Sequence, residues 1–164
     1  MEINNGFKKT YIQLLIDSLN KKYGILNELM QITVRQRDII NAQSFDDSEF
    51  MDTIALKEEL IKGLSELDKG FELVYDRVRD EIQQNSSMYQ SEITSLRELV
   101  TKVTDLSVNL QALEKSNKTN LEHVLSRKRK EIGKARMSNE TVANYYKTMS
   151  GRAESESYFY DKKN

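Results

Sequence analysis

The chain contains neither cysteine nor proline, and it has only six glycines among its 164 residues. Without cysteine it forms no disulfide, and the lack of cysteine is compatible with a reducing compartment. Without proline and with little glycine, it lacks most of the turn residues that sheet proteins need. The composition therefore predicts an all-α fold.

Long hydrophobic runs are also missing from the sequence. No segment approaches the roughly 18–20 apolar residues that a membrane span requires. Asp17 interrupts the one N-terminal stretch that would otherwise suit the core of a signal peptide. We therefore expect a cytoplasmic protein that does not insert into a membrane.

The inventory of catalytic side chains is equally small. His123 is the only histidine, and there is no thiol. Thiol catalysis, the usual zinc ligand sets and a di-iron site built on paired Glu-x-x-His motifs are therefore excluded within this chain. The glycines are scattered, so no loop of the GxxxxGK type is present to cradle a phosphate. We expect a protein that is not an enzyme and that has no metal site and no cofactor.

The apolar residues that are present follow helical spacing. Hydrophobic residues make up 38% of the chain and charged residues 31%, which favours a slim helical body over a wide core. Steps of three and four residues predict helices over residues 7–41 and 48–84, and a third helix from Met88 onward. The second helix has a coiled-coil seam with regular 4-3-4-3-4 spacing. That seam consists of Leu60, Leu64, Leu67, Phe71, Val74 and Val78.

Two polar residues interrupt the seam of the third helix. Apolar residues continue this seam as far as Leu113, but Asn117 and Asn120 then fall at seam positions. Polar seam residues either fix the register of a bundle or mark a place where it frays. Because the surrounding sequence "EKSNKTNLEH" is polar on every face, we interpret this interruption as fraying of the bundle, with the third helix projecting alone. The sequence leaves open whether this helix is continuous to Met137.

These patterns predict an antiparallel bundle, or coiled coil, of two to three long helices over residues 1–137. A lone helix of this kind would be marginal in water. The alternative is a helical hairpin that recruits a second copy of itself as a homodimer. Residues 138–164 form a separate region with a short C-terminal amphipathic helix and a disordered tail.

The short C-terminal helix has an apolar face. Ser138 is a suitable N-cap, and four apolar residues then follow at i, i+3, i+4 and i+7. They are Val142, Tyr145, Tyr146 and Met149. Tyrosine offers a large contact area and methionine adapts to irregular surfaces, so we favour binding in the groove of a partner protein. The alternative is that the helix folds back on its own bundle and extends the core, or alternates between the two states.

The tail beyond this helix ends in a second aromatic cluster. Residues 150–157, "SGRAESES", are polar and are expected to be disordered. Tyr158, Phe159 and Tyr160 then form a terminal apolar plug. Exposed aromatic residues lower solubility unless they dock on something. We therefore expect these three to contact the partner as well.

Basic residues are concentrated just before the C-terminal region, although the net charge of the chain is only −1. Such a density attracts polyanions, but charge runs usually solvate a helix. No nucleic-acid-binding motif is present, and no aromatic residues are interleaved with the basic ones. We interpret the run as a solvated face or as a partner of the acidic residues 46–81, and we expect no nucleic acid to bind. The run consists of Arg127, Lys128, Arg129, Lys130, Lys134 and Arg136.

Three parts of the sequence resemble the FlgN-type flagellar export chaperones. They are "YIQLLIDSLNKKYGILNELMQIT", "ALKEELIKGLSELDKGFELVYDRV", and the ending "ANYYKTM" with "SYFYDKK". The ending is similar to those of clostridial members. The resemblance implies a cytoplasmic chaperone that binds hook-filament junction proteins before their secretion. It also implies that the chaperone prevents their premature assembly and hands them to the export gate and ATPase components of the flagellar type III apparatus.

The resemblance also implies where the client binds. The substrate-binding determinants of the family would correspond to the apolar face that includes Val142 and Met149. One tyrosine of the doublet Tyr145 and Tyr146 would dock on the export gate. The doublet leaves open which of the two does so. A structural coiled-coil adaptor of the export apparatus, which would bind through exposed heptads, is the alternative function. A polyanion-binding helical protein is a further alternative.

Overall fold

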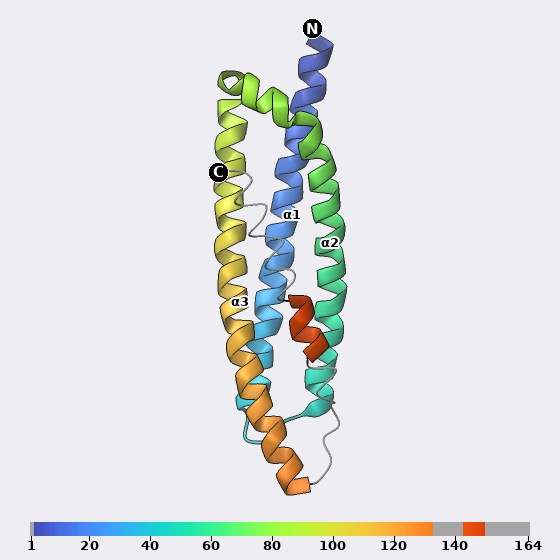
Figure 1. Cartoon of the computed structure of the whole chain (residues 1–164), viewed down its shortest axis with the longest axis vertical. Coiled ribbons are helices and arrows are strands. Elements are labelled where there is room, and N and C mark those ends of the chain that lie inside the picture. The colour runs from blue at the N-terminus through green and yellow to red at the C-terminus, as the bar shows by residue number, and fades with distance from the viewer. Residues whose placement is uncertain (1, 133–142, 150–164) are drawn as a thin grey trace.

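The computed structural model describes residues 2–132 and 143–149, and every element in these ranges is helical (Figure 1). Three long helices run antiparallel to their neighbours along the chain, so the predicted all-α bundle is confirmed. A short helix covers residues 143–149. The other elements are α1 (Glu2–Asn41), α2 (Asp47–Gln84), the 3-10 turn η1 (Ser86–Tyr89) and α3 (Gln90–Ile132).

The start of α2 is fixed by a cap and a pair of rings. Asp46 has extended backbone angles, and its carboxylate accepts a hydrogen bond from the Glu49 backbone N–H at 3.0 Å. This bond satisfies one of the free N–H groups at the helix start. Phe45 precedes the cap and packs against Phe50, with ring centroids 5.7 Å apart. This contact between N′ and N4 is a hydrophobic staple, and it sets the direction in which α2 leaves the turn.

The connection from α2 to α3 is a short turn with one buried side chain. The Asn85 backbone N–H donates to the Glu81 carbonyl at 2.9 Å and ends α2. The 3-10 turn η1 follows at once, and its last residue, Tyr89, is fully buried. Burial of this aromatic side chain holds the turn against the bundle.

Helix α1 is the centre of the bundle. It packs along both α2 and α3, whereas α2 and α3 approach each other closely at few points. In Figure 1 the helix of residues 143–149 (red) lies between α1 and α2, and Tyr145 also contacts Glu114 of α3. We call the surface of α1, α2 and α3 against which residues 143–149 pack the docking face. The core is therefore made within one chain, by three helices and this short fourth one.

The core has two parts along the bundle. The part near η1 is built from Ile12, Leu15, Leu19, Phe71, Val78, Tyr89 and Leu96. The other part lies at the opposite end and includes Tyr145, Tyr146 and Met149 together with residues of all three long helices. The short helix thus completes one half of the core.

Helix α3 does not fray at Asn117, so that interpretation of the sequence was wrong. Asn117 is buried, and its side-chain amide donates to the Thr33 carbonyl of α1 at 3.0 Å. The apolar residues Leu121, Val124 and Leu125 beyond it are also buried. The physical reason is that α1 offers a polar partner opposite the polar seam residue. Asn117 therefore fixes register, and α3 continues at least to Ile132.

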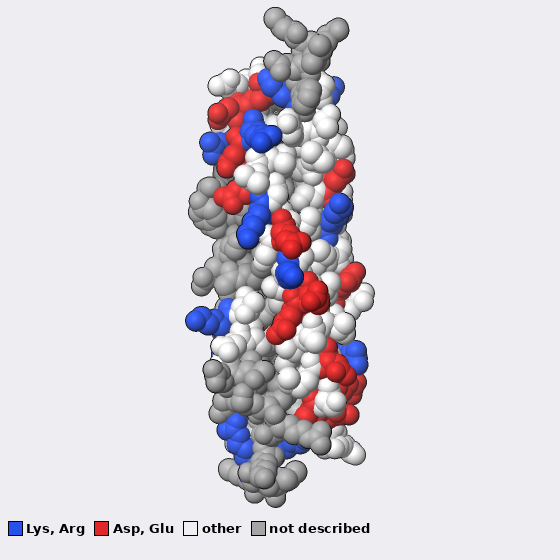
Figure 2. All heavy atoms as spheres, turned by 90° about the vertical axis from the view of Figure 1, so that its right-hand side faces the viewer, with Lys and Arg blue, Asp and Glu red and all other residues white. Residues whose placement is uncertain are grey.

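Charged residues of both signs are distributed along the face of the bundle that α2 forms. Figure 2 views the bundle from the side on which α2 lies, and acidic side chains are spread along this face with basic ones between them. None of the helices among residues 2–132 and 143–149 combines the length and the apolar character that crossing a bilayer requires. The predicted division of the chain after residue 137 falls outside the described residues.

The packing around α1 leads to a first prediction. Leu29 is fully buried in the core half that contains the C-terminal helix, whereas Leu56 is half exposed on α2. Leu29→Ala should lower the free energy of unfolding by about 2–5 kcal/mol, because it leaves a cavity. The matched change Leu56→Ala should alter it by less than about 0.5 kcal/mol. Urea denaturation followed by circular dichroism measures both, and equal losses would contradict this placement of the core.

Candidate functional site

The helix of residues 143–149 contacts the bundle through three side chains. Tyr145 and Tyr146 are each 5% exposed and Met149 is 8% exposed, whereas the residues between and before them face solvent. The amphipathic face predicted from the sequence is therefore present. However, it packs against the chain's own bundle, which is the alternative that the sequence left open. The reason is that the docking face offers both apolar and polar partners for these side chains.

Several residues of the predicted partner-binding set lie outside the described residues. They are Val142, Tyr158, Phe159 and Tyr160. For these four residues, partner binding stays a prediction.

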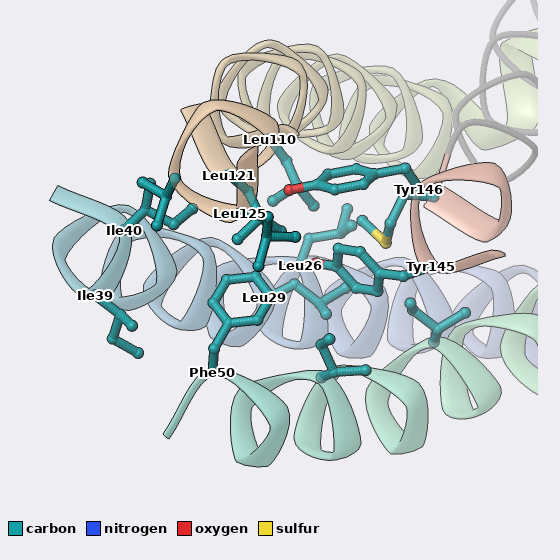
Figure 3. Packing of buried hydrophobic residues seen from close by; sticks show 14 of the residues in the cluster. Leu26, Leu29, Ile39, Ile40, Phe50, Leu110, Leu121, Leu125, Tyr145 and Tyr146 are labelled. Atoms are coloured by element: carbon teal, nitrogen blue, oxygen red, sulfur yellow. The ribbon is translucent and has the colours of Figure 1, made fainter. Parts of the chain in front are cut away.

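The two tyrosine rings enter different parts of the docking face. In Figure 3, Tyr145 lies next to Leu26 and Leu29 of α1, and Tyr146 lies towards Leu110 of α3, all within one cluster. The rings meet edge to face, with centroids 4.8 Å apart and an interplanar angle of 72°. This is a favourable arrangement for two aromatic side chains.

Beneath Tyr145 the docking face contains a group of buried polar side chains, which we call the polar cluster. Its members come from all three long helices, and none is more than 3% exposed. They are Thr33 and Gln36 of α1, Thr53 and Lys57 of α2, and Glu114 and Asn117 of α3. Buried polar groups are costly unless they are hydrogen-bonded, so the contacts among them decide whether this site is stable.

Lys57 is the hub of the polar cluster. Its ammonium group contacts the Glu114 carboxylate directly, and it donates to Gln36 Oε1 at 3.0 Å and to Thr33 Oγ1 at 2.6 Å. These three acceptors use all three N–H groups of the ammonium. Burial lowers the pKa of Lys57. The pair thus links α2 to α3 across α1.

Tyr145 joins the C-terminal helix to this cluster. Its hydroxyl oxygen lies 2.9 and 3.1 Å from the two carboxylate oxygens of Glu114, and 3.1 Å from Gln36 Oε1. The Lys57 nitrogen lies 5.0 Å from the centroid of the Tyr145 ring. Burial raises the pKa of Tyr145, so the hydroxyl stays protonated. It donates a hydrogen bond to the Glu114 carboxylate. The side chain therefore makes a charge-assisted hydrogen bond and a cation–π contact.

Tyr146 lacks such a partner. Its hydroxyl is buried and has no hydrogen-bond partner among the residues that the structure describes. The nearest favourable charge is Lys118, whose nitrogen lies 5.9 Å from the ring centroid. An unsatisfied buried hydroxyl costs about 1–3 kcal/mol. The two adjacent tyrosines thus have opposite effects on docking through their hydroxyl groups.

These terms place docking near balance. Burial of three side chains and one charge-assisted hydrogen bond stabilise the docked helix by at most about 6–12 kcal/mol. Ordering seven residues costs about 7–14 kcal/mol in backbone entropy. Docking and undocking of residues 143–149 are therefore close in free energy.

The spacing of the charged residues along the sequence contains a signal for the polar cluster. Lys57 precedes Ile61 and Leu64 by four and seven residues, and Glu114 follows Leu110 by four. These spacings place both charged residues on the apolar stripes of their helices. A lysine and a glutamate on facing stripes are candidates for a buried ion pair.

The basic run is only partly described. Lys128 donates to the Asp47 carboxylate and to the Phe45 carbonyl, both at 2.9 Å, and so connects the end of α3 to the start of α2. Arg127 and Arg129 lie on exposed positions of α3. The side chains of Lys130, Lys134 and Arg136 are outside the described residues. The structure thus gives Lys128 an acidic partner within the chain.

The contrast between the tyrosines can be tested with two matched variants, each of which removes one oxygen atom. Tyr145→Phe should weaken docking by about 1.5–3 kcal/mol, because a bond to a charged group is lost. Tyr146→Phe should strengthen docking, because an unsatisfied hydroxyl is removed. Amide hydrogen exchange of residues 143–149 should be faster in the first variant and slower in the second. Changes of the same sign would contradict these assignments.

Comparison with known proteins identifies the family. The sequence model described as FlgN protein matches residues 10–155, which is most of the chain. No curated protein and no solved structure matches the sequence. The resemblance seen in the sequence is therefore confirmed at the level of the family, which is a family of chaperones rather than of enzymes. The chain belongs to the FlgN family of flagellar export chaperones.

Proposed function

We propose that this chaperone works in the cytoplasm, binds hook-filament junction proteins before their secretion, and hands them to the gate and ATPase components of the flagellar type III export apparatus. Family membership supports chaperone function in flagellar assembly. The client class and the export step rest on the sequence resemblance, including the similarity of the ending to clostridial members. One observation carries the proposal: residues 143–149 pack an aromatic and methionine face, made of Tyr145, Tyr146 and Met149, against the bundle.

The face has the chemistry that suits a helical client. Tyr145, Tyr146 and Met149 form one apolar side of residues 143–149, and Val142 extends it by one position. Aromatic and methionine side chains supply large and adaptable contacts to an amphipathic helix. We assign the client contact to these four residues, with Tyr158, Phe159 and Tyr160 as a second contact from the tail.

Client binding requires the helix of residues 143–149 to leave the docking face. In the free chain the three side chains are almost completely buried, so a client cannot reach them there. Because docking is close to balance, release costs little, and the helix orders again on the client. Segments that order on binding gain large contact surfaces at the expense of affinity. Moderate affinity suits a chaperone that must later give up its client.

The client contact is tested by changing the two sides of the same helix. Replacing Tyr145, Tyr146 and Met149 by Ala should abolish co-purification of the hook-filament junction proteins of the same organism. Each of the three truncated side chains removes a large apolar contact, and a few such residues usually carry most of the binding energy. Pull-down with the tagged full chain measures the effect.

The matched control replaces Asn144, Lys147 and Thr148, which face solvent, by Ala. This variant should retain the junction proteins. Circular dichroism should show that α1, α2 and α3 remain helical in both variants. Undiminished capture by the first variant would contradict the proposed contact, and would instead favour binding through the bundle, as in a structural adaptor.

A further inference from the structure

The docking face and the proposed client compete for the same side chains. Tyr145, Tyr146 and Met149 are buried when residues 143–149 pack on the bundle. A side chain buried in this way cannot contact a second protein at the same time. Docking and client binding are therefore mutually exclusive states of one helix.

The polar cluster favours the closed state, in which the helix is docked, without depending on it. Glu114 is held by Lys57 and also lies 3.0 Å from the Thr33 hydroxyl, so its carboxylate has partners even when Tyr145 is absent. The ion pair can thus persist when the helix leaves. When the helix docks again, the Glu114 carboxylate accepts a hydrogen bond from the Tyr145 hydroxyl. Glu114 is a fixed receptor for Tyr145, and it belongs to the bundle rather than to the client-binding face.

The closed state also contains a feature that favours opening. The Tyr146 hydroxyl has no hydrogen-bond partner among the described residues, and burial raises its pKa, so it stays neutral. In water, or on a client with an acceptor, the same hydroxyl would be satisfied. The Lys118 nitrogen lies over this ring, 5.9 Å from its centroid, and this cation–π contact partly compensates. The closed state is therefore stabilised at Tyr145 and destabilised at Tyr146.

We propose that the docking face is an internal competitor of the client, and that Glu114 and Lys118 set the client affinity by setting the fraction of chains in the closed state. This inference rests on the proposed function, because it takes residues 142–149 as the client contact. When only the open state binds, the apparent dissociation constant is the intrinsic one divided by the open fraction. Residues that never touch the client then control how tightly it binds.

The inference predicts that two bundle variants bind the client more tightly. Glu114→Gln keeps the shape of the side chain but removes the charge that strengthens the Tyr145 bond, and should raise client affinity about five- to tenfold. Lys118→Ala removes the cation near the Tyr146 ring and should raise it about two- to fivefold. A destabilising change would ordinarily weaken binding, so an increase distinguishes competition from simple damage.

The experiment combines two measurements on the full chain. Amide exchange of residues 143–149 without client should become faster in both variants. Exchange in α1 should remain unchanged in Lys118→Ala, whose side chain is exposed. Titration of each purified junction protein should then show tighter binding by a similar factor. Lys115→Ala removes the same charge from an exposed position of α3 and serves as the control, which should change neither measurement.

The outcomes separate the two proposals. Faster exchange with unchanged or weaker client affinity overturns the inference and leaves the proposed function intact. Absence of junction-protein binding by every form, Glu114→Gln included, overturns both. If Glu114→Gln fails to fold, Lys118→Ala decides the matter, because Lys118 is exposed and its replacement leaves the core untouched.

Discussion

The rest of the structure depends on the contact between Lys57 and Glu114. Helices α2 and α3 approach each other closely at few points, and this ion pair links them across α1. Removing one partner from a buried ion pair typically costs about 3–5 kcal/mol, because the remaining charge is left in a dry site. A shift of either helix along α1 would separate the charges. The pair therefore fixes the register of three helices whose leucine seams alone would tolerate sliding.

The same contact gives the C-terminal helix a specific place to dock. An apolar surface alone would accept many amphipathic helices, but the Glu114 carboxylate selects a side chain that combines a ring with a hydroxyl donor. Tyr145 places its hydroxyl against this carboxylate, whereas the Tyr146 hydroxyl reaches no acceptor among the described residues. Specific docking and weak docking are compatible, because the segment is short and most of its contact energy offsets its own ordering. A chaperone that must bind and release a client benefits from this balance.

Much of the fold was predictable because it follows from local rules. The absence of proline, the three- and four-residue spacing and the seam of residues 60–78 predicted long antiparallel helices, and the structure confirms them. The amphipathic face of residues 143–149 and the family were predicted for the same reason, since both are encoded in consecutive residues. The role of Asn117 was misinterpreted because the effect of a polar seam residue depends on the group that it faces. Here that group is the Thr33 carbonyl, which lies far away in the sequence.

The sequence by itself determined which residues form helices and which side of each helix is apolar. Only the tertiary structure decided what those sides pack against: that Lys57 meets Glu114, that Asn117 meets Thr33, and that the aromatic face docks on its own bundle. The physical reason is that helical periodicity depends on neighbours within one or two turns. The choice of partner depends on burial and hydrogen bonding between segments that come together only when the chain folds.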